Sequence, residues 1–218
     1  MGSIPECLKV HRLTITLYIR LSKGVHPSAL IGALATALLL FLALEGGGGG
    51  EGWGRGSAFV HLGAFATHFG TQIWMTFFSG IVLFFGLPRK AFGAVQRLLF
   101  PVYFALNTGL GLLSLLTLPP DATHAQRFNL SLLIVCDILG SSVIVPAMVR
   151  TLGARGRLEG DRELEPKERA HLLRTSKEYA QQHAVFRRLH GACALVNLLA
   201  MACNAARLYH LAGRMVAT

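Results

Sequence analysis

The sequence predicts an all-α, polytopic transmembrane helix bundle with four core spans and an additional N-terminal hydrophobic helix. Three observations favour this fold class. The chain of 218 residues is 52% hydrophobic and only 15% charged, with a mean hydropathy of +0.49, which is too apolar for an ordinary soluble domain. Its apolar residues form long runs separated by basic or glycine-rich stretches. None of these runs alternates polar and apolar side chains as the strands of a membrane barrel do.

The first 56 residues are predicted to be an appended leader. A basic segment, residues 1–27, precedes the apolar run Ser28–Leu44, whose length is at the short limit for crossing a hydrocarbon core of about 30 Å. This run is either a retained span or a cleaved signal peptide. A cleavage site after Ala43 would put Phe41 where a small residue is required, which favours the retained span. The glycines Gly46–Gly50 indicate a linker rather than a phosphate-binding loop.

The remainder, residues 57–218, is predicted to be the helix bundle. Backbone polar groups must be satisfied within each segment in lipid, so each apolar run should be helical. Pro88 should end the first span, Pro119 the second, and Pro146 should kink the third. The predicted spans are residues 57–87, 94–118, 128–149 and 184–212.

A group of motifs surrounds the basic elbow Leu87-Pro88-Arg89-Lys90. The chain reads Gly70-Thr71-Gln72-Ile73-Trp74 before the elbow, and Phe92-Gly93-x-Val95-Gln96 followed by Leu99-Phe100-Pro101-x-Tyr103-Phe104 after it. In this combination and spacing, residues 57–212 resemble the transmembrane protein 205-like family, a four-helix membrane domain of unknown function. The resemblance implies unassigned biochemistry with a reported link to cellular tolerance of platinum drugs, which favours export or trafficking. The matched positions nominated by the resemblance are His61, Gln72, Trp74, Thr76, Ser79, Arg89, Gln96, Tyr103, His190, Asn197 and Asn204.

The distribution of basic residues predicts the orientation of the chain. Lys and Arg number four before Ser28, three around the elbow and ten between Arg150 and Arg188, with one or two in each of the other connections and at the C-terminus. The positive-inside rule therefore places the N-terminus, the elbow and the 151–183 connection in the cytosol. An endomembrane or the plasma membrane is expected. The net charge of +10 is explained by this pattern, so no nucleic-acid partner is expected.

The connection formed by residues 151–183 mixes acidic and basic side chains. Pro166 suits the first position of a helix, and Leu172, Tyr179 and Phe186 recur at helical spacing toward the last span. An interfacial helix leading into that span is predicted. The connection is either a solvated linker or a segment that binds a cytosolic partner.

Polar residues inside the spans are the candidates for function. On the first core span they fall on one helical face, and unpaired polar groups are costly in hydrocarbon, so the polar faces should turn inward and meet. The residues of this candidate polar pathway are His61, His68, Gln72, Tyr103, Asn107, Asp137, His190, Asn197 and Asn204.

Two explanations fit such a polar interior. Its amides and hydroxyls act as hydrogen-bonding glue between helices, or Asp137 and the histidines form a protonatable or metal-binding site along a solute path. His61 and His68 are two turns apart, about 10 Å, which is too far to share an ion, so no metal or other cofactor is predicted. Arg89 and Lys90 are expected to anchor at lipid headgroups rather than to gate a substrate.

These patterns favour a multi-pass membrane protein that transports or exports a small solute or metal complex. A non-transporting adaptor or trafficking protein, which engages a partner through residues 151–183, is the alternative. No hydrolase motif or pair of intramembrane acids occurs, so no enzymatic activity is expected. Four helices form a thin wall for a pore, so transport would favour a homo-oligomer within the lipid bilayer.

Overall fold

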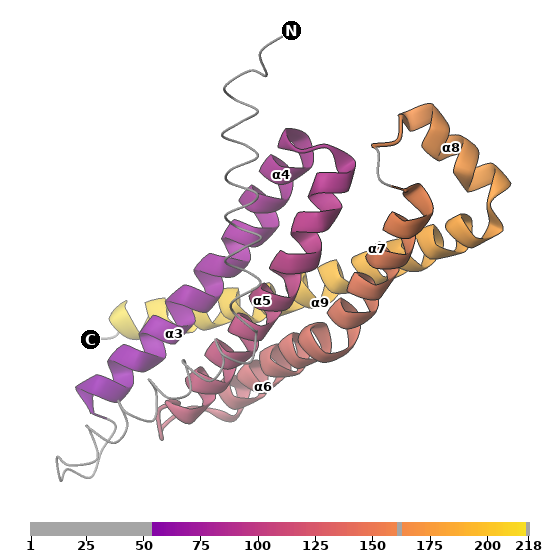
Figure 1. The fold of residues 1–218 in the computed structure, drawn as a ribbon. Helices are drawn as coiled ribbons and strands as arrows, with labels where there is room; N and C mark the ends of the chain where they lie inside the picture. Colours follow the sequence, from indigo (N-terminus) through magenta and orange to yellow (C-terminus); the bar gives the residue numbers. More distant parts are fainter. Residues whose placement is uncertain (1–53, 161–162, 217–218) are drawn as a thin grey trace, which may run out of the picture.

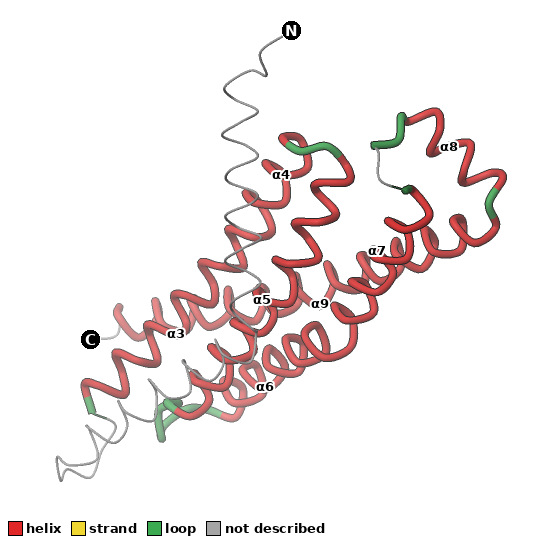
Figure 2. The backbone as a smooth tube through the Cα atoms, in the orientation of Figure 1, coloured by secondary structure: helices red, strands yellow, loops and turns green. Residues whose placement is uncertain are grey.

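The structure is a computed structural model that describes residues 54–160 and 163–216, and Figure 1 shows its helices. The predicted hydrophobic segment at residues 28–44 lies outside the described residues, as does nearly all of the leader. Within the described ranges every regular element is a helix and no strand occurs (Figure 2). The predicted all-α class is therefore confirmed.

The first half of the bundle is a helical hairpin. Its first arm runs without a break through α3 (Arg55–Ile73), the π-helical segment η1 (Trp74–Ser79) and α4 (Gly80–Gly86), and its second arm is α5 (Arg89–Leu116). Leu87 between the arms is extended, with φ −120° and ψ 145°. The ring of Pro88 disfavours a helical conformation at the preceding residue, which explains why the first arm ends there.

The second half contains two long helices and one short one. The first long helix comprises α6 (His124–Leu139), the π-helical segment η2 (Gly140–Ile144) and α7 (Val145–Glu159). The short α8 (Pro166–Thr175) and the long α9 (Lys177–Val216) follow. Pro166 stands at the start of α8, as predicted, and an extended Ser176 separates α8 from α9.

Four helices among the described residues are long and apolar enough to cross a membrane. Each predicted span is found, but each helix is longer than its apolar run because it continues into polar sequence. The four helices are Arg55–Gly86, Arg89–Leu116, His124–Glu159 and Lys177–Val216. Pro146 is the second residue of α7, two positions after η2 ends at Ile144, so its missing N–H falls close to the π-helical interruption of the regular hydrogen-bond ladder.

α9 runs beside both halves of the bundle and closes its interior. It packs against α6 and α7 along their length and also touches α3 (Figure 1). One apolar cluster lies toward the elbow and includes Tyr103, Phe104, Met148 and Cys193. A second lies toward the α5–α6 turn, and it contains Leu130, Leu133, Ile134, Cys136, Ala200 and Cys203.

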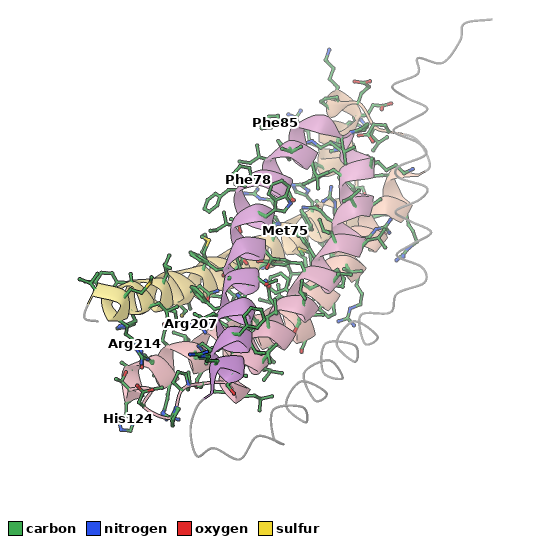
Figure 3. All side chains as sticks on the ribbon, turned by 90° about the vertical axis from the view of Figure 1, so that its left-hand side faces the viewer. Met75, Phe78, Phe85, His124, Arg207 and Arg214 are labelled. Atoms are coloured by element: carbon green, nitrogen blue, oxygen red, sulfur yellow. The ribbon has the colours of Figure 1, made fainter. Side chains whose placement is uncertain are left out.

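The outer surface of the first arm is strongly apolar. Figure 3 shows Phe78 and Phe85 pointing outward from the bundle, and they are 51% and 80% exposed. Phe77 and Ile81, near them on the same arm, are also exposed. Exposure of such a surface to water is unfavourable, whereas contact with lipid acyl chains is favourable, so the surface supports the membrane assignment.

The close approach of α5 to η2 depends on a glycine. A Cβ atom on Gly140 would lie 2.4 Å from the buried ring of Phe104. Gly140→Ala should therefore lower the free energy of unfolding by about 1–3 kcal/mol through overpacking. Gly63→Ala is the matched control, because a Cβ there meets nothing within 4 Å and the substitution gains helix propensity. Thermal unfolding in detergent measures both, and equal effects of the two substitutions would contradict this packing.

Candidate functional site

The buried face of α3 is polar. His61, His68 and Gln72 follow one another at intervals of seven and four residues, and the exposed fractions of these residues are 6%, 0% and 0%. At this spacing they share one side of the helix. α9 contributes Asn204 and Arg207 from its own buried face, with exposed fractions of 0% and 8%. The two faces meet in the middle of the bundle.

A buried histidine–carboxylate pair lies at the centre of this interior. His68 Nε2 on α3 is 2.7 Å from Asp137 Oδ2 on α6. Their side chains are 1% and 2% exposed. Gly111 on α5 lies close to the same stretch of α6, because a Cβ there would be 3.1 Å from Ile134, 3.3 Å from Leu133 and 3.6 Å from Asp137 Oδ2. Three helices thus enclose the carboxylate.

The Asn204 amide fixes the hydrogen-bonding roles of His68. Its Nδ2 donates to His68 Nδ1 at 2.7 Å and to Gln72 Oε1 at 2.8 Å. Arg207 Nη1 approaches Asn204 Oδ1 at 3.4 Å, which sets the orientation of the amide. In this arrangement His68 accepts at Nδ1, so its Nε2–H donates to the Asp137 carboxylate.

Arg207 supplies the positive charge of the site. Its Nη2 is 3.3 Å from His61 Nε2, and its guanidinium lies 5.0 Å from the centre of the Phe65 ring. Figure 3 shows Arg207 where α9 passes beside α3. His61, His68, Gln72, Asp137, Asn204 and Arg207 form what we call the buried network. It joins one cation to one carboxylate through neutral groups, as buried charges require.

A second polar cluster lies nearer the elbow. Tyr103 Oη donates to Asn197 Oδ1 at 2.6 Å, and Asn197 Nδ2 donates to Thr76 Oγ1 at 2.8 Å. Between this cluster and the buried network, Thr71 Oγ1 donates to Asn107 Oδ1 at 2.9 Å. Asn107 is one helical turn from Tyr103, and Thr71 adjoins Gln72 in the chain. Polar side chains therefore follow the bundle axis over several turns.

Cavities open at both ends of this polar column. At the end near the α5–α6 turn, a cavity of about 500 Å³ is lined by His61 and Arg207 together with Pro119 and Arg214. Toward the elbow, an apolar cavity of about 630 Å³ reaches Thr76, Tyr103 and Asn197. Figure 3 places His124 and Phe85 near these opposite ends.

Comparisons with known proteins agree with this architecture. Residues 63–157 match the family described as Domain of unknown function (DUF4149). Transmembrane protein 205 of Danio rerio is 28% identical over 173 residues, which cover 70% of this chain and 90% of the fish protein. The predicted resemblance to transmembrane protein 205 is therefore confirmed over most of the chain. Xanthocillin biosynthesis cluster protein D of Aspergillus fumigatus is 35% identical over 60 residues, or 28% of this chain and 38% of the fungal protein. No solved structure matches.

Most predicted pathway residues lie inside the bundle. The buried ones are His61, His68, Gln72, Tyr103, Asn107, Asp137 and Asn204, and Asn197 is half-buried. Asp137 and His68 are brought into direct contact, although they are 69 residues apart. A role of these residues in a solute path stays a prediction.

His190 is placed differently from the expected inner face. It is exposed and stacks on Phe186 with ring centres 5.7 Å apart, outside the buried network. The buried residue in this part of α9 is Cys193, three positions after His190. His190 therefore lies beside the buried face of α9 and not on it. Arg207 is not in the predicted set, because the count of basic residues assigns it to the C-terminal end of the chain. Its spacing of three from Asn204 and seven from Ala200 was the signal for the buried face.

The two elbow cations contact protein groups. Arg89 lies over the Phe84 ring at 4.3 Å. Lys90 donates from Nζ to the Gly160 carbonyl at 2.8 Å and from its backbone N–H to Glu163 at 2.9 Å. The elbow is thereby tied to the 151–183 connection. Anchoring of both cations at lipid headgroups stays a prediction.

The described residues do not bring metal ligands together. In the ranges 54–160 and 163–216, no group of three or more His, Cys, Asp or Glu side chains is close enough to hold an ion. Cys136, next to Asp137 in the chain, instead packs in the apolar cluster near the α5–α6 turn.

The His68–Asp137 contact predicts strong energetic coupling. His68→Leu alone should destabilise the protein by about 3–5 kcal/mol, because it leaves a buried carboxylate unpaired. The double variant His68→Leu with Asp137→Leu should be less destabilised than the sum of the single variants, by roughly 1–3 kcal/mol. Thermal or denaturant unfolding in detergent measures this cycle, and strictly additive effects would show that the pair does not interact.

Proposed function

We propose that the bundle transports a small solute in a proton-linked manner, with the His68–Asp137 pair as its protonatable centre. The single observation that supports this most is the burial of this pair inside a membrane-spanning bundle. An intramembrane carboxylate is expensive and normally serves a pathway. If the position served helix packing alone, a neutral side chain such as Asn or Ser could form the interhelical hydrogen bond equally well.

The layout of the polar column supports the same proposal. The cavity near the α5–α6 turn touches His61 and Arg207, and these residues connect through Asn204 to the His68–Asp137 pair. Protonation of His68 at Nδ1 would turn the Asn204 amide from a donor into a mismatch, and its reorientation would change the contact with Gln72. Binding of a proton to His68 would therefore be coupled to a movement of α9 relative to α3.

The side chains of the buried network suit proton transfer along the bundle better than catalysis at a single substrate site. The groups of the buried network are acids, bases and amides, arranged in series rather than around one substrate pocket. The positive-inside pattern would put the cavity near the α5–α6 turn on the side away from the cytosol.

Reconstituted vesicles test the proposal. Asp137→Asn keeps the size of the side chain but removes its charge and should reduce acid-driven proton uptake at least about tenfold, because no carboxylate remains to exchange the proton. A pH-sensitive dye inside the vesicles measures the uptake, with and without candidate solutes outside.

A matched control comes from the same pair of helices. Asn129 on α6 donates to the Cys203 carbonyl on α9 at 2.8 Å and lies outside the buried network. Asn129→Ala should leave uptake within about twofold of the unsubstituted protein, since it removes only an interhelical bond. Proton uptake that is equal in Asp137→Asn and the unsubstituted protein would exclude the proposed role.

A partner-binding role is the second candidate, and α8 favours it. This helix has no buried residue and stands at the outer edge of the bundle (Figure 1). Replacing the 151–183 connection by a neutral linker should then remove a co-purifying cytosolic protein while proton uptake persists. An unchanged set of co-purifying proteins would count against an adaptor.

A further inference from the structure

A basic cavity lies beneath the elbow, outside the buried network. It has a volume of about 700 Å³ and is enclosed by the start of α5, the end of α7 and the first turns of α9. Among the described residues that line it, Glu159 is the only acid. The cations that line it are Arg89, Lys90, Arg97, Arg155, Arg157 and Arg169.

Among the described residues, acids compensate only part of this positive charge, and Arg169 pairs with Glu163, outside the lining, at 3.4 Å. Glu159 is already engaged by Arg155 at 3.3 Å and by the Tyr179 hydroxyl at 2.5 Å. Arg97 and Arg157 both bring a guanidinium nitrogen within 3.9 Å of the position of a Cβ on Gly153. Neither pairs with an acid in the part of the chain that the structure describes. Two like charges that converge in this way favour an anion between them.

Unpartnered nitrogen atoms give a second, independent indication. Arg155 Nε, Arg169 Nε and His183 Nδ1 are buried and make no hydrogen bond, and all three residues line the basic cavity. The two arginine Nε atoms are donors, and His183 Nδ1 donates in one of its two tautomers. Buried donors without acceptors are costly in a folded protein, so a ligand rich in acceptor oxygens would satisfy them. A phosphate group offers such oxygens together with the required negative charge.

The basic cavity continues into an apolar one. The cavity of about 630 Å³ shares Arg89, Phe92, Gln96 and Phe186 with it, and extends between the first arm, α5 and α9. Beyond the shared residues its lining is largely apolar, as Leu83 illustrates. A charged compartment and an apolar compartment therefore adjoin at the end of the bundle where headgroups and acyl chains also adjoin.

We propose that these joined cavities bind one anionic phospholipid, with its phosphate in the basic cavity and an acyl chain in the apolar cavity. A free phosphate would use only the first compartment, and an acidic peptide would leave the second unfilled. The lipid alone matches both compartments and reaches them directly from the bilayer. This inference does not rest on the proposed transport, because it concerns other cations and a binding assay.

Native mass spectrometry of the purified full-length chain tests the proposal with dioleoyl phosphatidic acid as the probe. Dioleoyl phosphatidylcholine and inorganic phosphate are the comparison ligands. The double variant Arg97→Gln with Arg157→Gln should bind phosphatidic acid at least about tenfold more weakly, because two cations that face the phosphate are lost. The control Arg150→Gln with Arg188→Gln removes two exposed cations that do not line the cavity and should change binding less than about threefold.

Binding of the acyl chain in the apolar cavity is tested by a substitution that fills this cavity with a larger side chain. Ala194 lines the apolar cavity and Ala192, also exposed on α9, does not. Ala194→Trp should weaken binding of phosphatidic acid at least about fivefold, while Ala192→Trp should leave it unchanged, since only the first occupies the volume of the chain. Equal losses in the Arg97/Arg157 and Arg150/Arg188 variants would overturn the site in favour of diffuse attraction. Full competition by inorganic phosphate with no effect of Ala194→Trp would overturn the lipid in favour of a free phosphate site.

Discussion

The buried contact between His68 and Asp137 is the constraint on which the interior depends. A carboxylate in a membrane-spanning bundle must be neutralised or paired. The buried cation Arg207 is connected to Asp137 through Asn204 and His68. This requirement fixes the rotation of α3, α6 and α9 about their axes. At this level α5 presents Gly111, where a Cβ would crowd Ile134 and Leu133 of α6.

The rest of the bundle separates three environments around that centre. The outward face of the first arm is apolar and suits acyl chains, and the apolar clusters hold α9 against α6 and α7. Among the described residues, the cavity at the elbow end is lined by more cations than acids. Small residues allow the helices to approach closely where the polar column needs enclosure, as the contact of Gly140 with Phe104 shows.

Periodicity and composition were sufficient to predict most of this fold. Long apolar runs and the prolines at 88 and 119 gave the spans and the elbow, because helix formation in lipid is governed by local sequence. The inward turn of His61, His68 and Gln72 followed from their spacing. The pairing of His68 with Asp137 and the burial of Arg207 did not follow, because they depend on which helices are neighbours and how each is rotated. His190 shows the same limit, since its exposure depends on the path of α9 past α5.

The central claim is that lipid surrounds the bundle and that the polar face of α3 is turned away from it. Spin labels placed singly along α3 and η1, with collision rates measured for oxygen dissolved in the bilayer, test this most directly. The account predicts low oxygen collision rates at 61, 65, 68 and 72 and high rates at 62, 66, 77 and 78. High rates at positions 68 and 72, or a profile without helical periodicity, would contradict it.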